Sequence, residues 1–129
     1  MRYSGYLLKE SLQDKSVLES LEITETETIP CPEHMKADYM DDVWTGMVFV
    51  GDADEVDHIS ELLSEAIKSR GWYLNINTDT DNYIIFHKKV IKYPRQGEKQ
   101  PWPKEAIEAA RKAEIPSFVK NENVSTEEI

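Results

Sequence analysis

Cys31 and His34 are the residues of this chain whose types and spacing come closest to a reactive site. A thiolate and an imidazole at this spacing are compatible with two ligands of one metal ion, and Asp38 adds an oxygen ligand nearby. Cys31 could also act as a nucleophile with His34 as its base. A structural zinc site needs four ligands, however, and Cys31 is the single cysteine of the chain. The simpler interpretation is a turn between Pro30 and Pro32 with solvated polar side chains, and we therefore predict no metal, cofactor or catalytic residue.

Other local signals for catalysis are weak. Asp38, Asp41 and Asp42 could bind Mg²⁺ or share a proton, but the chain carries 25 acidic residues, so neighbouring carboxylates arise from composition alone. The glycine spacing matches neither a phosphate-binding loop nor a dinucleotide-binding fingerprint. No Gly-x-Ser-x-Gly nucleophile elbow occurs either. These motifs act through local spacing, so their absence indicates a protein without these chemistries.

The chain also contains a candidate binding surface on a predicted β-hairpin. Within residues 72–77, apolar side chains alternate with tyrosine and asparagine, which indicates a half-buried strand. If helices cover the apolar set, the other set faces outward, where alternate residues of the second strand, 83–87, could join it. Such a face could pack against a second subunit or line a ligand pocket, although the last helix and the 94–102 loop could equally cover it. The predicted binding residues are Tyr73, Asn75, Tyr83, Ile85 and His87.

Periodicity predicts a mainly antiparallel sheet with its helices on one face. Residues 21–29 alternate threonine with glutamate and indicate an edge strand, whose charges would prevent pairing with a second molecule. Residues 43–50 are apolar on both parities, which favours a central strand covered on both faces. The sequence pattern does not fix the strand register of residues 90–93. The expected elements are strands at 6–8, 21–29, 43–50, 72–77 and 83–87, and helices at about 12–20, 53–70 and 103–114.

Two local signals define the expected helix ends. Ser11 and Asp14 resemble a capping box at the start of the first, short helix. In the long helix, apolar residues recur at helical spacing from Val56 to Ile67, and Gly71 is typical of a left-handed terminating residue.

Charge is unevenly distributed along the chain. Residues 1–86 carry 6 basic and 18 acidic side chains, whereas residues 87–112 carry 8 basic and 3 acidic ones. The basic segment includes Tyr93 and Trp102 and could dock on an acidic or phosphate-bearing partner. It could equally neutralise the acidic remainder of the fold or of a second copy. The net charge of −10 repels nucleic acid at long range, so we predict no nucleic-acid binding.

Three stretches carry a resemblance to other sequences. They are the opening Gly5-Tyr6-Leu7-Leu8-Lys9-Glu10-Ser11, the segment Gly71-Trp72-Tyr73, and residues 86–93. Through them the chain resembles a group of small prokaryotic proteins of uncharacterised function. The resemblance implies a cytoplasmic prokaryotic protein and identifies no catalytic residue.

Size and composition bound the fold class. With 129 residues, 40% of them hydrophobic, the chain fits one domain over 1–119, followed by a polar tail at 120–129 that we expect to be disordered. No apolar run approaches the roughly 20 residues of a membrane span, and the start lacks a signal peptide. A single cysteine fits a reducing compartment. Together these three observations predict a cytoplasmic protein without membrane association. The predicted fold is α+β, a ferredoxin-like two-layer sandwich with an extra C-terminal strand and helix.

The function predicted from the sequence is non-catalytic binding or assembly through the amphiphilic sheet face. Its sharpest form is a homodimer, with another protein partner or a small-molecule ligand as further possibilities. The alternative is a small enzyme or metal-dependent protein centred on Cys31, His34 and Asp38.

Overall fold

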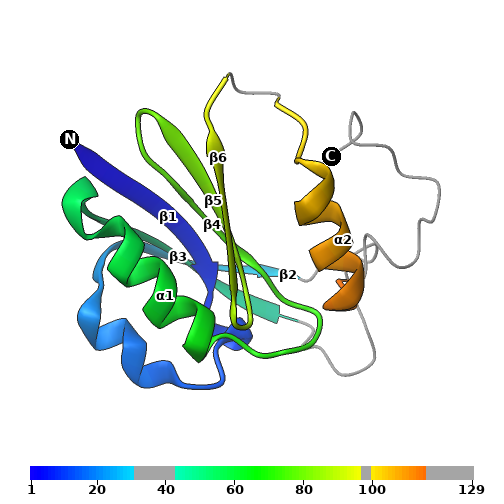
Figure 1. Ribbon diagram of the computed structural model, residues 1–129. Coiled ribbons are helices and arrows are strands. Elements are labelled where there is room, and N and C mark those ends of the chain that lie inside the picture. Colours follow the sequence, from blue (N-terminus) through cyan, green and yellow to red (C-terminus); the bar gives the residue numbers. More distant parts are fainter. Residues whose placement is uncertain (31–42, 97–99, 116–129) are drawn as a thin grey trace.

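The computed structural model describes residues 1–30, 43–96 and 100–115 of the chain. They form a six-stranded sheet in the order β2-β3-β1-β4-β5-β6, in which all neighbours are antiparallel (Figure 1). The strands are β1 (Arg2–Leu8), β2 (Glu22–Pro30), β3 (Val43–Asp52), β4 (Leu74–Asn77), β5 (Asp81–Phe86) and β6 (Lys89–Pro94). The helices are α1 (Val56–Ala66), α2 (Lys104–Lys112) and the 3-10 turns η1 (Lys9–Ser11), η2 (Lys15–Ser20) and η4 (Ala53–Glu55). The predicted α+β class with a mainly antiparallel sheet is confirmed.

Several strand predictions are confirmed and others need correction. β2 lies at the edge of the sheet, as its threonine and glutamate alternation predicted. β3 is second from the edge rather than central, because only β2 lies beyond it. The sheet continues past β4 through β5 and β6, where the sequence predicted one additional strand.

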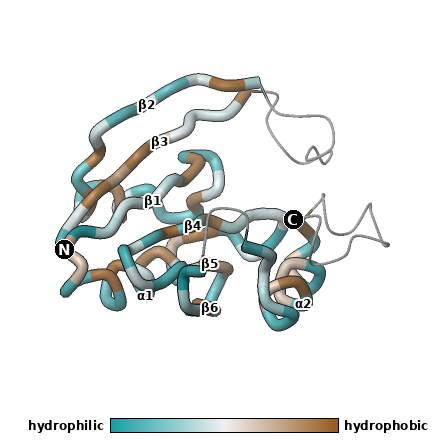
Figure 2. The backbone as a smooth tube through the Cα atoms, turned by 90° about the horizontal axis from the view of Figure 1, so that it is seen from above, coloured by the Kyte–Doolittle hydropathy of each residue, from teal (hydrophilic) through white to brown (hydrophobic). Residues whose placement is uncertain are grey.

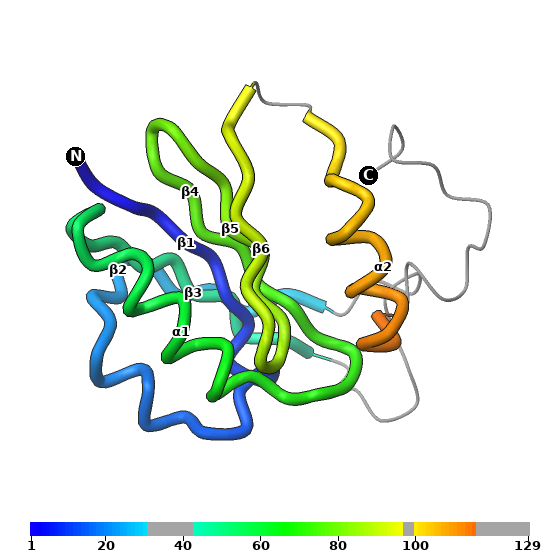
Figure 3. Tube along the Cα trace, viewed as in Figure 1, coloured from blue at the N-terminus to red at the C-terminus, as the bar shows by residue number. Residues whose placement is uncertain are grey.

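The two α-helices lie on opposite faces of the sheet, so the prediction of helices on one face is wrong. Along β5, Tyr83 and Ile85 belong to the core that includes α1, whereas Ile84 and Phe86 belong to a second core that includes α2. Figure 1 shows α1 and α2 on either side of the β4–β6 ribbons, and the trace in Figure 3 shows α2 beside β6. The sequence of β5 explains this arrangement, because it is apolar on both parities and therefore needs cover on both sides.

The long helix is shorter than its apolar stripe predicted. α1 ends at Ala66, although the pattern extends to residue 70 and Gly71 does have a positive φ of 86°. Ile67 leaves the helix to form a β-bridge with Leu12, and the Lys68 N–H donates to the Ser11 carbonyl at 2.8 Å. These bonds to the β1–β2 connection replace the last helical turn, and Ile67 remains fully buried.

The connection between β1 and β2 contains 3-10 turns where the sequence predicted a short α-helix. The predicted Ser11 cap is buried, and its hydroxyl donates to the Leu8 carbonyl at 2.5 Å. Asp14 caps η2 instead by accepting from the Ser16 N–H at 3.0 Å. The Ser16 hydroxyl and then the Ser16 N–H lower the pKa of the exposed Asp14 carboxyl.

α2 ends in a Schellman motif. The Ile115 N–H donates to the Ala110 carbonyl at 3.0 Å, and the Glu114 N–H donates to the Arg111 carbonyl at 3.1 Å. Glu114 occupies the left-handed position of this motif, with φ of 57°. The buried Ile115 supplies the hydrophobic contact that accompanies such a terminus.

The variant Glu114→Gly is expected to raise the free energy of unfolding by about 0.5–1 kcal/mol, because glycine removes the Cβ crowding of the left-handed conformation. The variant also loses an ion pair with Arg70 at 3.1 Å, but both side chains are more than half exposed, so this loss is small. Urea denaturation measures the change. Glu114→Ala is the matched control, since it loses the same ion pair and keeps the Cβ. Equal stabilities of the two variants would contradict the strain argument.

None of the helices in the described part of the chain is long and apolar enough to cross a membrane.

Candidate functional site

The five predicted binding residues do not share one face of the sheet. The β4–β5 register pairs Leu74 with Ile85 and Asn75 with Ile84. Directly paired residues point to the same face, so Asn75 and Ile85 point to opposite faces. The prediction combined odd-numbered residues of both strands, which requires an odd number of residues in the turn. Residues 78–81 separate the partners Asn77 and Asn82, and this even number reverses the parity.

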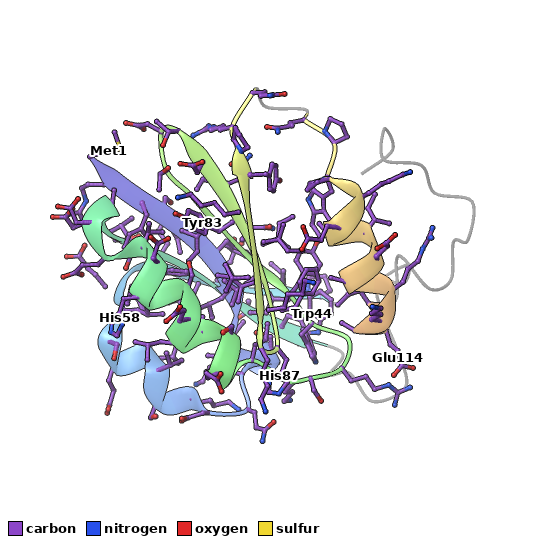
Figure 4. All side chains as sticks on the ribbon, viewed as in Figure 1. Met1, Trp44, His58, Tyr83, His87 and Glu114 are labelled. Carbon is purple, nitrogen blue, oxygen red and sulfur yellow. The ribbon has the colours of Figure 1, made fainter. Side chains whose placement is uncertain are left out.

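Tyr83 and Ile85 lie in the core beneath α1. Ile85 is fully buried and Tyr83 is 3% exposed, with its hydroxyl donating to Asp57 Oδ1 at 3.0 Å. Burial is the main cause that raises the pKa of Tyr83, and the hydrogen bond to Asp57 adds to it. Figure 4 shows Tyr83 between α1 and the sheet. The two residues anchor α1 and are not part of an exposed binding surface.

Tyr73 belongs to an aromatic cluster beside α2. Its ring centroid lies 5.0 Å from that of Trp102 and 6.2 Å from that of Phe86. Burial raises the pKa of the Tyr73 phenol. The residue therefore packs in the second core. The alternative interpretation of the sequence, in which the last helix covers the outward face of the hairpin, holds for this side of the hairpin.

His87 lies in the tight turn between β5 and β6, beyond the end of β5. Its Nδ1 is 2.9 Å from the Ile67 carbonyl oxygen, so this nitrogen carries the proton and donates. In the same turn the Lys88 N–H donates to the Ser64 carbonyl at 2.9 Å. Both bonds satisfy carbonyl groups at the end of α1, which assigns His87 a structural role (Figure 4).

Asn75 points to the same side of the sheet as its β5 partner Ile84, which is the side that α2 covers. The α2 core includes no residue of β1, β2 or β3, so no described helix covers this side of the sheet over those strands. Asn75 pairs with Tyr6 of β1, and Tyr6 pairs with Val48 of β3 on its other side. Figure 2 shows β2 and β3 on the side of the molecule away from both helices. We call this surface the uncovered face; its residues are Ser4, Tyr6, Val48, Val50 and Asn75.

The uncovered face is partly apolar and accessible. Tyr6 is 38% exposed, one of the most exposed large hydrophobic residues among those described. Val48 and Val50 are half-buried and belong to neither hydrophobic core of the described residues. A β-face of tyrosine and valine without cover is a common feature of interaction sites.

Glutamates border this face along β2. Glu22, Glu25 and Glu27 pair with residues of β3 that point to the same side as Tyr6. The Tyr6 hydroxyl donates to Glu27 Oε1 at 3.3 Å, and Arg2 forms an exposed ion pair with Glu22 at 3.0 Å. Burial, followed by the negative charge of Glu27, raises the pKa of Tyr6, so the phenol remains a donor at neutral pH.

Sequence reasoning missed Tyr6 because Tyr6, Leu7 and Leu8 form a continuous apolar run. The signal that could have identified it is the alternation of buried and exposed residues along β1, in which Tyr3, Gly5 and Leu7 are buried and Tyr6 is exposed. Gly46, opposite Leu8, lets the Tyr6 ring lie against the backbone of β3, in the space that a Cβ would occupy. A small residue diagonal to an aromatic one on the neighbouring strand marks such a position only once the register is known.

The candidate metal ligands Cys31, His34 and Asp38 lie outside the described residues. Within the described residues, no group of three or more histidine, cysteine or carboxylate side chains is arranged to hold a metal ion. Two surface depressions of about 480 and 220 Å³ flank the β5–β6 turn. Both are lined by side chains of both charge signs.

The basic segment is partly used within the fold. Lys89 pairs with Glu105 at 3.5 Å, and the Arg95 guanidinium donates to the Thr78 carbonyl at 3.1 Å. The ammonium group of Lys92 lies 5.6 Å from the centre of the Tyr83 ring. The ion pair lies within the basic segment itself, and the other two contacts join the segment to uncharged groups of Thr78 and Tyr83.

Comparisons of the chain with protein-family models, curated proteins and solved structures find no match.

Proposed function

We propose that this protein is a non-catalytic binding module that recognises a protein partner through the uncovered face. The observation that carries the proposal is the accessible Tyr6 beside Val48 and Val50, outside both hydrophobic cores of the described residues. The surface differs from the one that the sequence pattern predicted, but its amphiphilic character is the same.

A second copy of the chain fits this face less well than a different protein does. Each copy carries a net charge of −10, so two copies repel each other at long range. The glutamates of β2 border the face and add local negative charge to both sides of any self-contact. A partner with positive charge would instead be attracted and steered to the surface.

Site-specific photo-cross-linking tests the proposal. Replacement of Tyr6 by p-benzoylphenylalanine is expected to give one discrete adduct in cells that express the protein natively. The same replacement at Glu61, an exposed position of α1, is the matched control and should give none. An adduct of about twice 14.9 kDa identifies a second copy, and any other mass identifies a different protein.

Competition shows whether the uncovered face is responsible. Excess wild-type protein should suppress the Tyr6 adduct, whereas the double variant Tyr6→Lys/Val48→Glu should fail to compete. Circular dichroism confirms that this variant is folded, which we expect because neither side chain belongs to a described core. Equal cross-linking at both positions, or equal competition by both proteins, would reject the uncovered face as a binding surface.

We also propose that β1–β4 follow a ferredoxin-like plan. The order β2-β3-β1-β4 supports this, because the connections β1–β2 and β3–β4 each skip the strand between their ends. The first connection carries η1 and η2 where that plan has an α-helix, and β5, β6 and α2 are additions. An experimental structure tests the proposal, which requires both crossovers to be right-handed.

A further inference from the structure

The free edge of β2 offers a second way to hold a partner. β2 ends the sheet, and no described strand lies beyond it. It has nine residues, and residues 24–28 are all exposed. Proteins protect an edge with short strands, prolines, bulges or charged side chains. The only proline of β2 is its last residue, Pro30, and its protection consists of the glutamates and a bulge between Ile23 and Glu25. The glutamates repel a strand of like charge but not one of opposite charge. A long accessible edge can accept an added strand from another chain.

The side chains of β2 define which strand would fit. Glu22, Glu25 and Glu27 point to the side of the uncovered face, and Thr26 and Thr28 point to the other side. Glu22 of this row forms an ion pair with Arg2. A strand added beside β2 places its alternate residues opposite the glutamates, where opposite charges stabilise and like charges destabilise the pairing.

We propose that the partner binds as an extended segment that adds to the β2 edge, with lysine or arginine at alternate positions. Its other positions would carry threonine or other β-branched residues, which pair well with the threonine side of β2. The glutamates then select the partner by charge, because a second β2 strand would place glutamate beside glutamate. This inference rests on the proposed function, since β2 borders the uncovered face.

The probe is a nine-residue peptide that alternates lysine and threonine, with a peptide of alternating glutamate and threonine for comparison. Binding of the lysine peptide is measured by fluorescence anisotropy, and amide hydrogen exchange locates it. We expect slower exchange in residues 22–30 and no measurable binding of the glutamate peptide. Protection elsewhere, or equal binding of both peptides, would overturn the proposal.

Charge reversal separates edge pairing from general electrostatic attraction. Glu25→Lys/Glu27→Lys should weaken binding of the lysine peptide about tenfold, because two attractive cross-strand pairs become repulsive. It should also create binding of the glutamate peptide. The control Glu61→Lys/Glu65→Lys makes the same change in net charge on α1 and should alter binding less than threefold. Equal effects of the two double variants would show that net charge alone attracts the peptide and would overturn the inference.

The two proposals fail in different ways. A Tyr6 adduct whose yield is unchanged by Glu25→Lys/Glu27→Lys would retain the uncovered face and reject the β2 edge. Absence of the Tyr6 adduct, together with charge-selective binding of the lysine peptide at residues 22–30, would reject the face and support the edge.

Discussion

Truncation of Phe86 to alanine is expected to lower the free energy of unfolding by about 3–5 kcal/mol. Phe86 is 3% exposed and lies in the second core with Ile107 of α2. Its ring centroid is 6.4 Å from that of Trp102 and 6.2 Å from that of Tyr73. Removal of the ring leaves a cavity and deletes both aromatic contacts, which accounts for the size of the effect.

Double-mutant cycles show which side of the sheet Phe86 supports. Phe86→Ala and Trp102→Ala should be non-additive by about 0.5–1.5 kcal/mol, because their rings are in contact. Phe86→Ala and Ile59→Val should be additive, since Ile59 lies in the α1 core on the opposite face. The exposed Lys112→Ala variant of α2 is a control that should change stability by less than about 0.5 kcal/mol. Coupling of Phe86 to Ile59 instead of Trp102 would contradict the placement of α2.

Gly5→Ala is expected to destabilise the protein by about 2–3 kcal/mol, although alanine normally improves the interior of a strand. A Cβ at Gly5 would overlap the end of the Phe49 ring and lie 2.7 Å from both of its Cε atoms. Phe49 is fully buried and packs edge-on against Tyr3, with ring centroids 6.1 Å apart. The ring therefore has no space to move, and the added methyl group overpacks the core.

A second substitution should relieve this overlap. Phe49→Leu shortens the side chain at the position that a Cβ of residue 5 would meet, so Gly5→Ala should cost at least about 1 kcal/mol less in that background. Urea denaturation of the four proteins of the cycle gives the coupling. Ser4→Ala adds no atoms on the adjacent, exposed position of β1 and should be nearly neutral. Strict additivity of Gly5→Ala and Phe49→Leu would contradict the steric explanation.

Much of the local structure could be predicted from the sequence. The alternation of threonine and glutamate identified β2 as an edge strand, and the apolar run of 43–50 identified β3. The turn residues of 78–82 identified the β4–β5 hairpin. These features depend on side chains close together in the chain, whose period distinguishes a strand from a helix.

The type of candidate site could be predicted from the sequence, but not the residues that form it. The sequence indicated an amphiphilic sheet face, but the β4–β5 register placed Tyr83 and Ile85 in the core and left Asn75 beside Tyr6. A change of one residue in the length of a turn moves every side chain of a strand to the other face. Periodicity within one strand contains no information on that length.

What the sequence determined by itself was therefore the identity of most elements, the charge of the β2 edge and the lack of the catalytic motifs sought. Only the tertiary structure decided where α1 ends, which face α2 covers and which part of the sheet has no described helix over it. Ile67 leaves α1 because Leu12, distant in the chain, provides a buried β-bridge. Helix ends, strand register and helix placement all depend on such contacts, because each is set by burial and hydrogen bonds between residues far apart in the sequence.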